Sequence, residues 1–195
     1  MLLAIDIGNT RIKYAVFENN TIIDNHFFLK EDFLKEIEKI LNKYKNVSNL
    51  IVASVGNIEK EAFLVFQNRL KIHFITHKDK FPFVNLYATP HTLGIDRIVL
   101  ASGATLLYPN QNKLVIDAGT CVTYDFVDSN DNYLGGAISP GIRLRYEALH
   151  NYTAKLPLLT KKAPESFIGN STSESIHSGV VEGLVNEIDG FIDQY

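Results

Sequence analysis

Two stretches of this 195-residue chain repeat one pattern, and the repeat limits the possible folds more than any other feature. Residues 3–13 read LAIDIGNTRIK, and residues 114–126 read LVIDAGTCVTYDF. In each stretch an apolar run ends in Asp, Gly and Thr, and a run that alternates between apolar and polar residues follows. We therefore predict two β-turn-β elements, one in each half of the chain.

The first turn carries residue types that suit a phosphate group. Gly8 lets the backbone come close to a ligand, and consecutive amides together with the Thr10 hydroxyl can hold phosphate oxygens. Asp6, at the end of a buried strand, needs a cation or ordered water to offset its desolvation. For this segment alone, an ordinary hairpin with Asn9 as a turn residue is an equally good interpretation.

The second turn changes that balance, because Asp117, Gly119 and Thr120 repeat the same residue types. A duplicated turn of this kind indicates two halves with one architecture. We expect the two turns to face each other across a cleft and to hold the two ends of a polyphosphate.

The remaining periodicity predicts the order β-β-β-α-β-α-β for the first half. Three antiparallel strands followed by α/β crossovers form a mixed sheet, with a ligand at the strand ends. The first expected strand runs into Asp6, and the other four lie at 11–17, 21–29, 50–55 and 72–75. The expected helices lie at 31–45 and 59–70. In the helix at 31–45, the apolar residues on one face are Phe33, Leu34, Ile37, Ile40 and Leu41.

The second half repeats the β-β-β order, with its third strand at 133–139 and a helix at 142–150. Residues 171–174 read STSE, a capping box, and the helix behind it carries an apolar stripe from Ile176 to Ile192. That stripe suits packing against the core of the protein, and a role in a dimer interface is an open alternative. Because no strands follow before Tyr195, we expect the second domain to be incomplete and the chain to be truncated.

The stretch 85–97 has little periodicity and predicts a loop that enters a helix at 98–107. Asp96 is then expected at or near the N-cap, a role worth about 1 kcal/mol by itself. A capping carboxylate keeps one oxygen for a second role. Arg97 is either a surface ion pair or an anion-binding group, and both interpretations stay open.

Charge and cysteine content exclude some functions. A formal charge of −3 gives no electrostatic case for binding nucleic acid or an anionic membrane. No apolar segment approaches the ~18 residues that span a bilayer. The single cysteine, Cys121, indicates a reducing compartment and a cytoplasmic protein, and we expect it to be a small buried strand residue. The six histidines show no metal-ligand spacing.

The two repeats resemble the phosphate motifs of the acetate and sugar kinase, Hsp70 and actin superfamily. Three further motifs make nearly the whole chain similar to the type III pantothenate kinase family. In chain order they are Asn85-x-Tyr87-x-x-Pro90, Leu93-Gly94-Ile95-Asp96-Arg97 and Gly135-Gly136-Ala137-Ile138-Ser139-Pro140-Gly141.

The resemblance implies an α/β fold of duplicated ribonuclease-H-like, or actin-like ATPase, domains with mixed sheets. The domains would be 1–108 and 109–195, with the order β-β-β-α-β-α and an incomplete second domain. It also implies ATP-dependent phosphorylation of pantothenate to 4'-phosphopantothenate, the first step of coenzyme A biosynthesis, by a cytoplasmic homodimer whose substrate pocket the partner subunit completes.

The resemblance further implies a role for each matching residue. Asp96 accepts the proton of the pantothenate hydroxyl, Asp6 helps to hold Mg²⁺ through water, and Asp117 ligates K⁺ or NH₄⁺. The residues implied to bind ATP are Asp6, Ile7, Gly8, Asn9, Thr10, Arg11, Ile12, Lys13 and Thr120. The residues implied to bind pantothenate are Tyr87, Gly94, Ile95, Asp96, Arg97 and Thr172.

Three alternatives are weighed against this function. A catalytically weak or inactive nucleotide-binding or regulatory homologue would suit a missing C-terminal segment. A ribonuclease-H-like nuclease needs three or four clustered carboxylates for two metals, whereas each turn here brings Gly and Thr beside one Asp. A sugar or acetate kinase of the same superfamily is disfavoured by the motif at 94–97.

Overall fold

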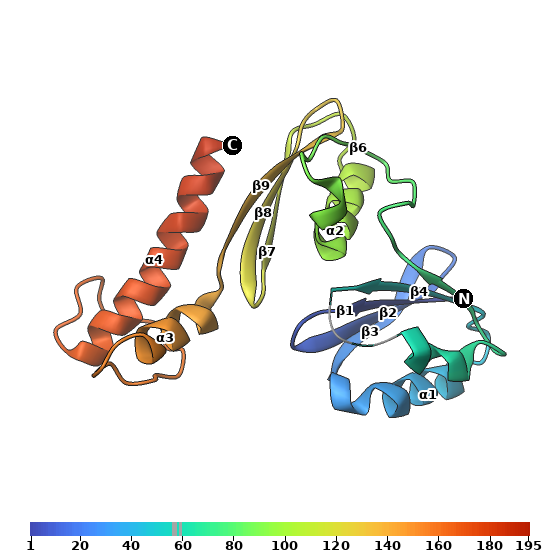
Figure 1. The fold of residues 1–195 in the computed structure, drawn as a ribbon, viewed down its shortest axis with the longest axis horizontal. Coiled ribbons are helices and arrows are strands. Elements are labelled where there is room, and N and C mark those ends of the chain that lie inside the picture. The colour runs from blue at the N-terminus through green and yellow to red at the C-terminus, as the bar shows by residue number, and fades with distance from the viewer. Residues whose placement is uncertain (56–57, 59) are drawn as a thin grey trace. The chain divides into compact units, whose positions relative to one another are not determined.

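The computed structural model describes residues 1–55, 58 and 60–195. Its contacts divide it into two units, the first made of 1–81 with 88–102 and the second of 82–87 with 103–195. Each unit is built on its own sheet (Figure 1). The domain boundaries expected from the sequence, 1–108 and 109–195, stay a prediction.

The first unit contains the predicted mixed sheet. Its strands lie in the order β3-β2-β1-β4-β5; β1–β2–β3 form an antiparallel meander, and β4 and β5 add in parallel. Ile12 and Val16 on β2 are fully buried, as the alternation predicted. The bounds are β1 Leu2–Ile7, β2 Arg11–Glu18, β3 Thr21–Leu29, β4 Asn49–Ser54 and β5 Lys71–Phe74.

Helix α1, Phe33–Lys43, follows a short 3₁₀ helix, η1, at Lys30–Asp32. It buries Phe33, Ile37, Ile40 and Leu41, as predicted. Leu34 was predicted on the same face but is 50% exposed. The reason is that Phe33 already takes the core-facing position in the first turn, where its ring packs edge-on against Phe63 at 4.8 Å.

The prediction of an α-helix at 59–70 was wrong. The described residues of this stretch form a 3₁₀ helix, η2, at Lys60–Phe66. Glu59, its predicted first residue, lies outside the described residues. Phe63 and Phe66 are both 1% exposed, and a three-residue spacing places them on one side of a 3₁₀ helix. The second helix of the predicted order is therefore not an α-helix.

The stretch 85–97 is less irregular than predicted. It contains the end of strand β6, Val84–Asn85, a 3₁₀ helix, η3, at Pro90–Thr92, and the start of helix α2, Ile95–Leu107. The helix begins three residues before the predicted position 98. The Ile98 N–H donates to the Gly94 carbonyl at 3.1 Å, so Asp96 lies inside the first turn and not at the N-cap.

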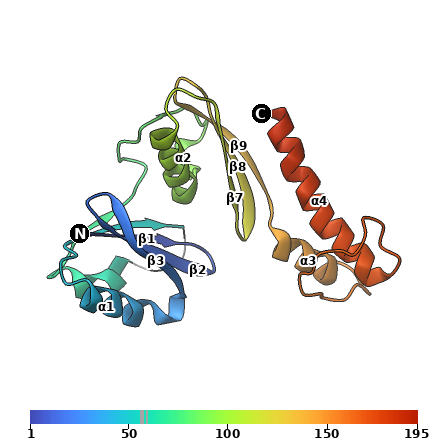
Figure 2. The same ribbon diagram turned by 180° about the vertical axis from the view of Figure 1, so that it is seen from behind.

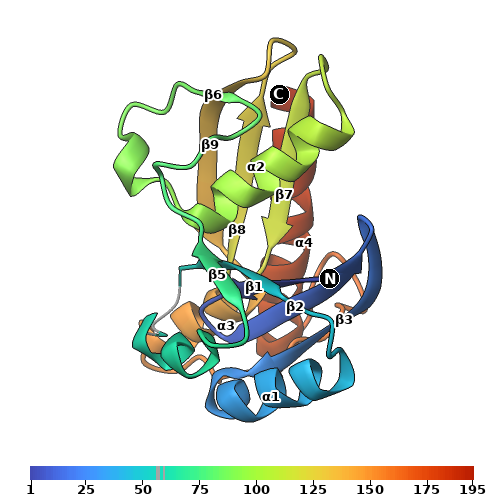
Figure 3. The same cartoon turned by 90° about the vertical axis from the view of Figure 1, so that its right-hand side faces the viewer.

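The second unit is built on a four-stranded sheet in the order β6-β9-β8-β7. Strands β7 Lys113–Ala118, β8 Cys121–Val127 and β9 Asn132–Pro140 repeat the antiparallel meander of β1–β3, and they lie side by side in Figure 3. The short strand β6 pairs in parallel with β9 and was not predicted. Within the described part of the chain, β7 is an edge strand of this sheet.

Helices α3, Ile142–Asn151, and α4, Thr172–Gln194, follow the sheet, and a long loop joins them (Figure 2). Tyr146 of α3 packs with Ile176 and Val180 of α4. The predicted capping box holds at its first residue, since the Ser171 hydroxyl accepts from the Glu174 N–H at 3.2 Å. No helix in the described residues is long and apolar enough to cross a bilayer.

The apolar stripe of α4 is divided between packing and exposure. Its first half supplies the core residues Ile176 and Val180, and near its end the Phe191 ring stacks on Tyr124 at 4.0 Å. Val185 and Ile192 are each 54% exposed. The stripe therefore serves core packing in part and leaves an apolar surface.

Candidate functional site

The first turn joins β1 to β2 as the sequence predicted. Asp6, near the end of β1, lies opposite Lys13 on β2. The Gly8 N–H donates to the Arg11 carbonyl at 3.1 Å and closes the turn. A Cβ atom at Gly8 would lie 3.2 Å from that oxygen, so glycine suits this position. Asn9 and Thr10 are exposed at the tip.

Asp6 and Lys13 form an ion pair that water can reach. Lys13 Nζ lies 3.8 Å from Asp6 Oδ2, and the side chains are 67% and 41% exposed. Exposed pairs of this kind contribute only about 0–1 kcal/mol. The Asp6 carboxylate is therefore accessible to a hydrated cation. The resemblance implied that this carboxylate helps to hold Mg²⁺ through water.

The second turn repeats the Asp, the Gly and the closing bond of the first, but it is one residue shorter. Asp117, near the end of β7, lies opposite Thr123 on β8. The Gly119 N–H donates to the Cys121 carbonyl at 2.9 Å. In both turns the glycine amide thus bonds to the first residue of the following strand, and the Asp lies two residues before the glycine. Cys121 is a strand residue, as predicted, but its free thiol is half-buried and not buried.

Gly141 brings the start of α3 against the second turn. Its N–H donates to the Thr120 carbonyl at 3.0 Å, and its carbonyl accepts the first helical bond, from Arg145. A Cβ atom here would lie 2.4 Å from the Gly119 carbonyl oxygen and 2.5 Å from that of Thr120. The amino end of a helix favours anions, so α3 adds positive potential beside this turn.

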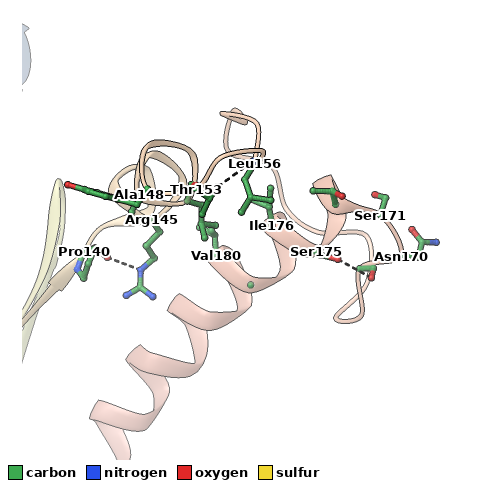
Figure 4. Close-up of a pocket in the computed structure, with 15 residues that line it drawn as sticks. Pro140, Arg145, Ala148, Thr153, Leu156, Asn170, Ser171, Ser175, Ile176 and Val180 are labelled. Carbon is green, nitrogen blue, oxygen red and sulfur yellow. Dashed lines mark hydrogen bonds between the residues drawn. The ribbon is translucent and has the colours of Figure 1, made fainter.

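The junction between β9 and α3 is held by Arg145. Its Nε donates to the Pro140 carbonyl at 2.8 Å, drawn as a dashed line in Figure 4, and a terminal nitrogen donates to the Ser139 hydroxyl at 2.7 Å. Neither the role of Gly141, in the 135–141 motif, nor that of Arg145 was predicted. The motif itself was the signal for Gly141; nothing in the sequence pointed to Arg145.

Asp96 lies in the first turn of α2. Its Oδ1 accepts from the Arg97 N–H at 2.8 Å. A Cβ atom at Gly94 would lie 2.3 Å from the same oxygen, so the glycine makes room for the carboxylate. Arg97 is only 5% exposed, which overturns its interpretation as a surface ion pair.

The residues predicted to bind pantothenate lie on different elements of the chain. Gly94 to Arg97 form the start of α2, Tyr87 follows β6, and Thr172 begins α4. Thr172 lines an open groove of about 1210 Å³ between α3 and α4, and Tyr87 does not (Figure 4). Apolar and hydroxyl side chains such as Leu156, Ser171 and Ile176 also line this groove.

Cation binding must rest on few protein ligands. Across residues 1–55, 58 and 60–195, no three His, Cys, Asp or Glu side chains cluster closely enough to hold a metal ion. Mg²⁺ keeps several waters and takes one or two carboxylates together with phosphate oxygens, so a single accessible Asp6 fits it. The residues present are therefore compatible with a metal that is held jointly with a nucleotide.

Two units with matching strand-turn-strand elements, each with an Asp and a Gly near the strand end, define an α/β protein with a duplicated element on two mixed sheets. This confirms the predicted class of two mixed sheets. The chain belongs to the type III pantothenate kinase family, whose model matches residues 2–194.

Individual relatives agree with the family. The chain is 65% identical over 195 residues to a type III pantothenate kinase of Flavobacterium johnsoniae, covering 100% of this chain and 80% of the relative. It is 62% identical over 193 residues to that of Flavobacterium psychrophilum, covering 99% and 80%.

One solved structure supports the fold. A protein of Campylobacter jejuni, described as a conserved Baf family transcriptional activator, superposes with a TM-score of 0.59 at 24% identity, covering 96% of this chain and 78% of the other.

Proposed function

We propose that this protein transfers the terminal phosphoryl group of ATP to the primary hydroxyl of pantothenate. The product is 4'-phosphopantothenate, and the reaction is the first step of coenzyme A biosynthesis. The observation that carries the proposal is the duplicated turn, in which the amides of Gly8 and Gly119 bond to the first residue of the following strand and Asp6 and Asp117 lie near the ends of the preceding strands. Membership of the family supplies the substrate.

Phosphoryl transfer has a loose transition state, so a kinase acts mainly by positioning and by stabilising charge. In this proposal residues 6–13 and Thr120 hold the phosphates, and Asp96 accepts the proton of the attacking hydroxyl. One oxygen of the Asp96 carboxylate accepts a hydrogen bond from the Arg97 N–H. In this proposal the other oxygen receives the proton of the substrate. Mg²⁺ would bind at Asp6 through water and neutralise phosphate charge.

Asp117 is proposed to ligate a monovalent cation, K⁺ or NH₄⁺. It lies two residues before Gly119 in the chain, and the carbonyl oxygens of Gly119 and Thr120 lie near Gly141. Carbonyl and carboxylate oxygens are suitable ligands for such ions. The cation would then stabilise the second turn and the phosphates that it holds.

The pantothenate pocket is proposed to consist of Tyr87, Gly94 to Arg97 and Thr172, and to be completed by the partner subunit of a homodimer. The exposed apolar residues Val185 and Ile192 of α4 support an intersubunit use of that helix. A cytoplasmic location is proposed because the single cysteine, Cys121, is a free thiol, as is usual in a reducing compartment.

A coupled assay of ADP release tests the proposal. We expect release to require pantothenate and to rise on addition of K⁺ or NH₄⁺, with a product one phosphoryl group heavier by mass spectrometry. In Asp117→Asn the response to K⁺ should be lost while ADP release at saturating ATP stays measurable. ATP binding without pantothenate-dependent ADP release would favour the alternative, a catalytically weak or inactive homologue.

A further inference from the structure

The backbone at Tyr87 is held by the sheet of the second unit. Strand β6 pairs with β9, placing Asn85 opposite Tyr133, and the Leu86 N–H donates to the Tyr133 carbonyl at 3.0 Å. The Tyr87 N–H then donates to the Asn85 side-chain oxygen at 3.0 Å. Such a bond to a residue two positions earlier forms an Asx turn, which asparagine and aspartate both support.

The Tyr87 ring rests on Gly135 of β9. Gly135 has φ of +113°, a conformation that other residues rarely adopt. A Cβ atom there would lie 3.3 Å from Tyr87 Cδ2 and 3.4 Å from Cε2. Glycine therefore allows both the local backbone path and the close approach of the ring.

The residues beside the Tyr87 ring are buried and packed against one another. Tyr133, whose ring centroid lies 6.1 Å from that of Tyr87, is 0% exposed and also packs against Phe83 at 5.5 Å. Its hydroxyl donates to the Asp125 carboxylate, which is likewise fully buried. A ring held by buried partners on this side has little freedom to rotate away.

We infer that Asn85 and Gly135 are positioning residues for Tyr87 and fix its ring for pantothenate recognition. The inference rests on the proposed function, which places Tyr87 in the pantothenate pocket. Neither Asn85 nor Gly135 is proposed to contact the substrate. Asn85 acts through the backbone of Tyr87, and Gly135 acts through the surface on which the ring lies.

The test compares Asn85→Ala with Asn85→Asp, because aspartate keeps the acceptor for the Tyr87 N–H and alanine removes it. Asn112→Ala is the matched control, since Asn112 accepts from the Ser129 N–H at 2.8 Å by the same kind of bond in another loop. Measurements are KM for pantothenate, KM for ATP and kcat, with the pantothenate Kd by calorimetry.

We expect Asn85→Ala to raise the pantothenate KM and Kd by about fivefold, the size expected for one lost hydrogen bond. The ATP KM and kcat should stay within about twofold in every variant, and Asn85→Asp and Asn112→Ala should resemble wild type. Gly135→Ala should raise the pantothenate KM at least as much as Asn85→Ala.

The inference is overturned if Asn85→Ala leaves the pantothenate constants unchanged or if the alanine and aspartate variants behave alike. Tyr87→Ala separates this failure from failure of the proposed function. If Tyr87→Ala weakens pantothenate binding and Asn85→Ala does not, only the positioning role is wrong. If Tyr87→Ala also has no effect, Tyr87 is not in the pocket and the proposed site fails with the inference.

Discussion

Arg145 on α3 and Glu187 on α4 form an ion pair of 2.5 Å, with side chains only 19% and 24% exposed. The other oxygen of Glu187 accepts from the Tyr124 hydroxyl of β8 at 2.9 Å. Because Arg145 also bonds to Ser139 and Pro140, the pair connects α4 to the junction that precedes Gly141. One carboxylate thus joins the last helix to the sheet and to the second turn.

Removing this carboxylate should destabilise the protein. Glu187→Ala leaves the Arg145 guanidinium and the Tyr124 hydroxyl without their shared partner in a largely buried place. Hydrogen bonds to charged groups contribute about 1.5–3 kcal/mol, so we expect the free energy of unfolding to fall by about 2 kcal/mol in denaturant titrations. Asp189→Ala, at an exposed carboxylate of the same helix, is the control and should change it by less than about 0.5 kcal/mol. Equal effects of the two substitutions would contradict a specific role for Glu187.

The same pair predicts a pH dependence of stability. Burial opposes ionisation of Glu187, but hydrogen bonds from Arg145, Ser139 and Tyr124 outweigh it and lower the pKa below its ordinary value of 4.5. Burial and the bond to Glu187 raise the pKa of Tyr124 to about 12, so its hydroxyl stays a donor. The depressed Glu187 pKa stabilises the fold above pH 4.5, and this contribution is lost as pH falls through the folded pKa.

Glu187→Gln isolates this effect, because it removes the charge and keeps the shape. The stability difference between wild type and Glu187→Gln should be constant above pH 5 and should shrink as pH falls below about 4.5. Unfolding titrations at several pH values measure it. A difference that stays constant into the acid range would mean that the Glu187 pKa is not depressed.

Gly141→Ala should weaken ATP binding. The new methyl group would overlap the carbonyl oxygens of Gly119 and Thr120, so the second turn or the start of α3 must move. Displacement of binding groups by about 1 Å costs on the order of a hundredfold in rate, and we expect a rise of tenfold to a hundredfold in the ATP KM. Initial-rate kinetics with varied ATP measure it.

The control for Gly141→Ala is Gly190→Ala, on an exposed part of α4 where a Cβ atom has no neighbour within 4 Å. Alanine is the better helix former, so this variant should gain about 0.5–1 kcal/mol of stability and keep its ATP KM. An unchanged ATP KM in Gly141→Ala would show that the second turn does not hold the nucleotide.

The sequence predicted features that depend on local patterns. The turns at Gly8 and Gly119, the strand from Thr21 to Leu29 and the Ser171 cap all lie where their periodicity or capping residues indicated. These features are determined by residues within a few positions of one another. The burial of Arg97 and the 3₁₀ form of η2 were not predicted, because both depend on packing against distant parts of the chain.

Long-range pairs were outside the reach of sequence reasoning. Glu187 lies 42 residues from Arg145 in the sequence. Nothing in the sequence around a single glutamate indicates which of the many charged residues of the chain it pairs with. Gly135 belongs to the 135–141 motif, but its contact with the Tyr87 ring follows from the pairing of β9 with β6. Strand β6 has only two residues. So short a strand gives no periodic signal.

The most direct test of the kinase account is the turnover number of Asp96→Asn, measured together with its ATP Kd. Asparagine keeps the size of the side chain and an acceptor for the Arg97 N–H, so the start of α2 should stay intact. If Asp96 accepts the hydroxyl proton, kcat should fall on the order of a hundredfold to ten-thousandfold while the ATP Kd stays within about twofold of wild type. A kcat close to that of wild type would contradict the assignment of Asp96 as the base.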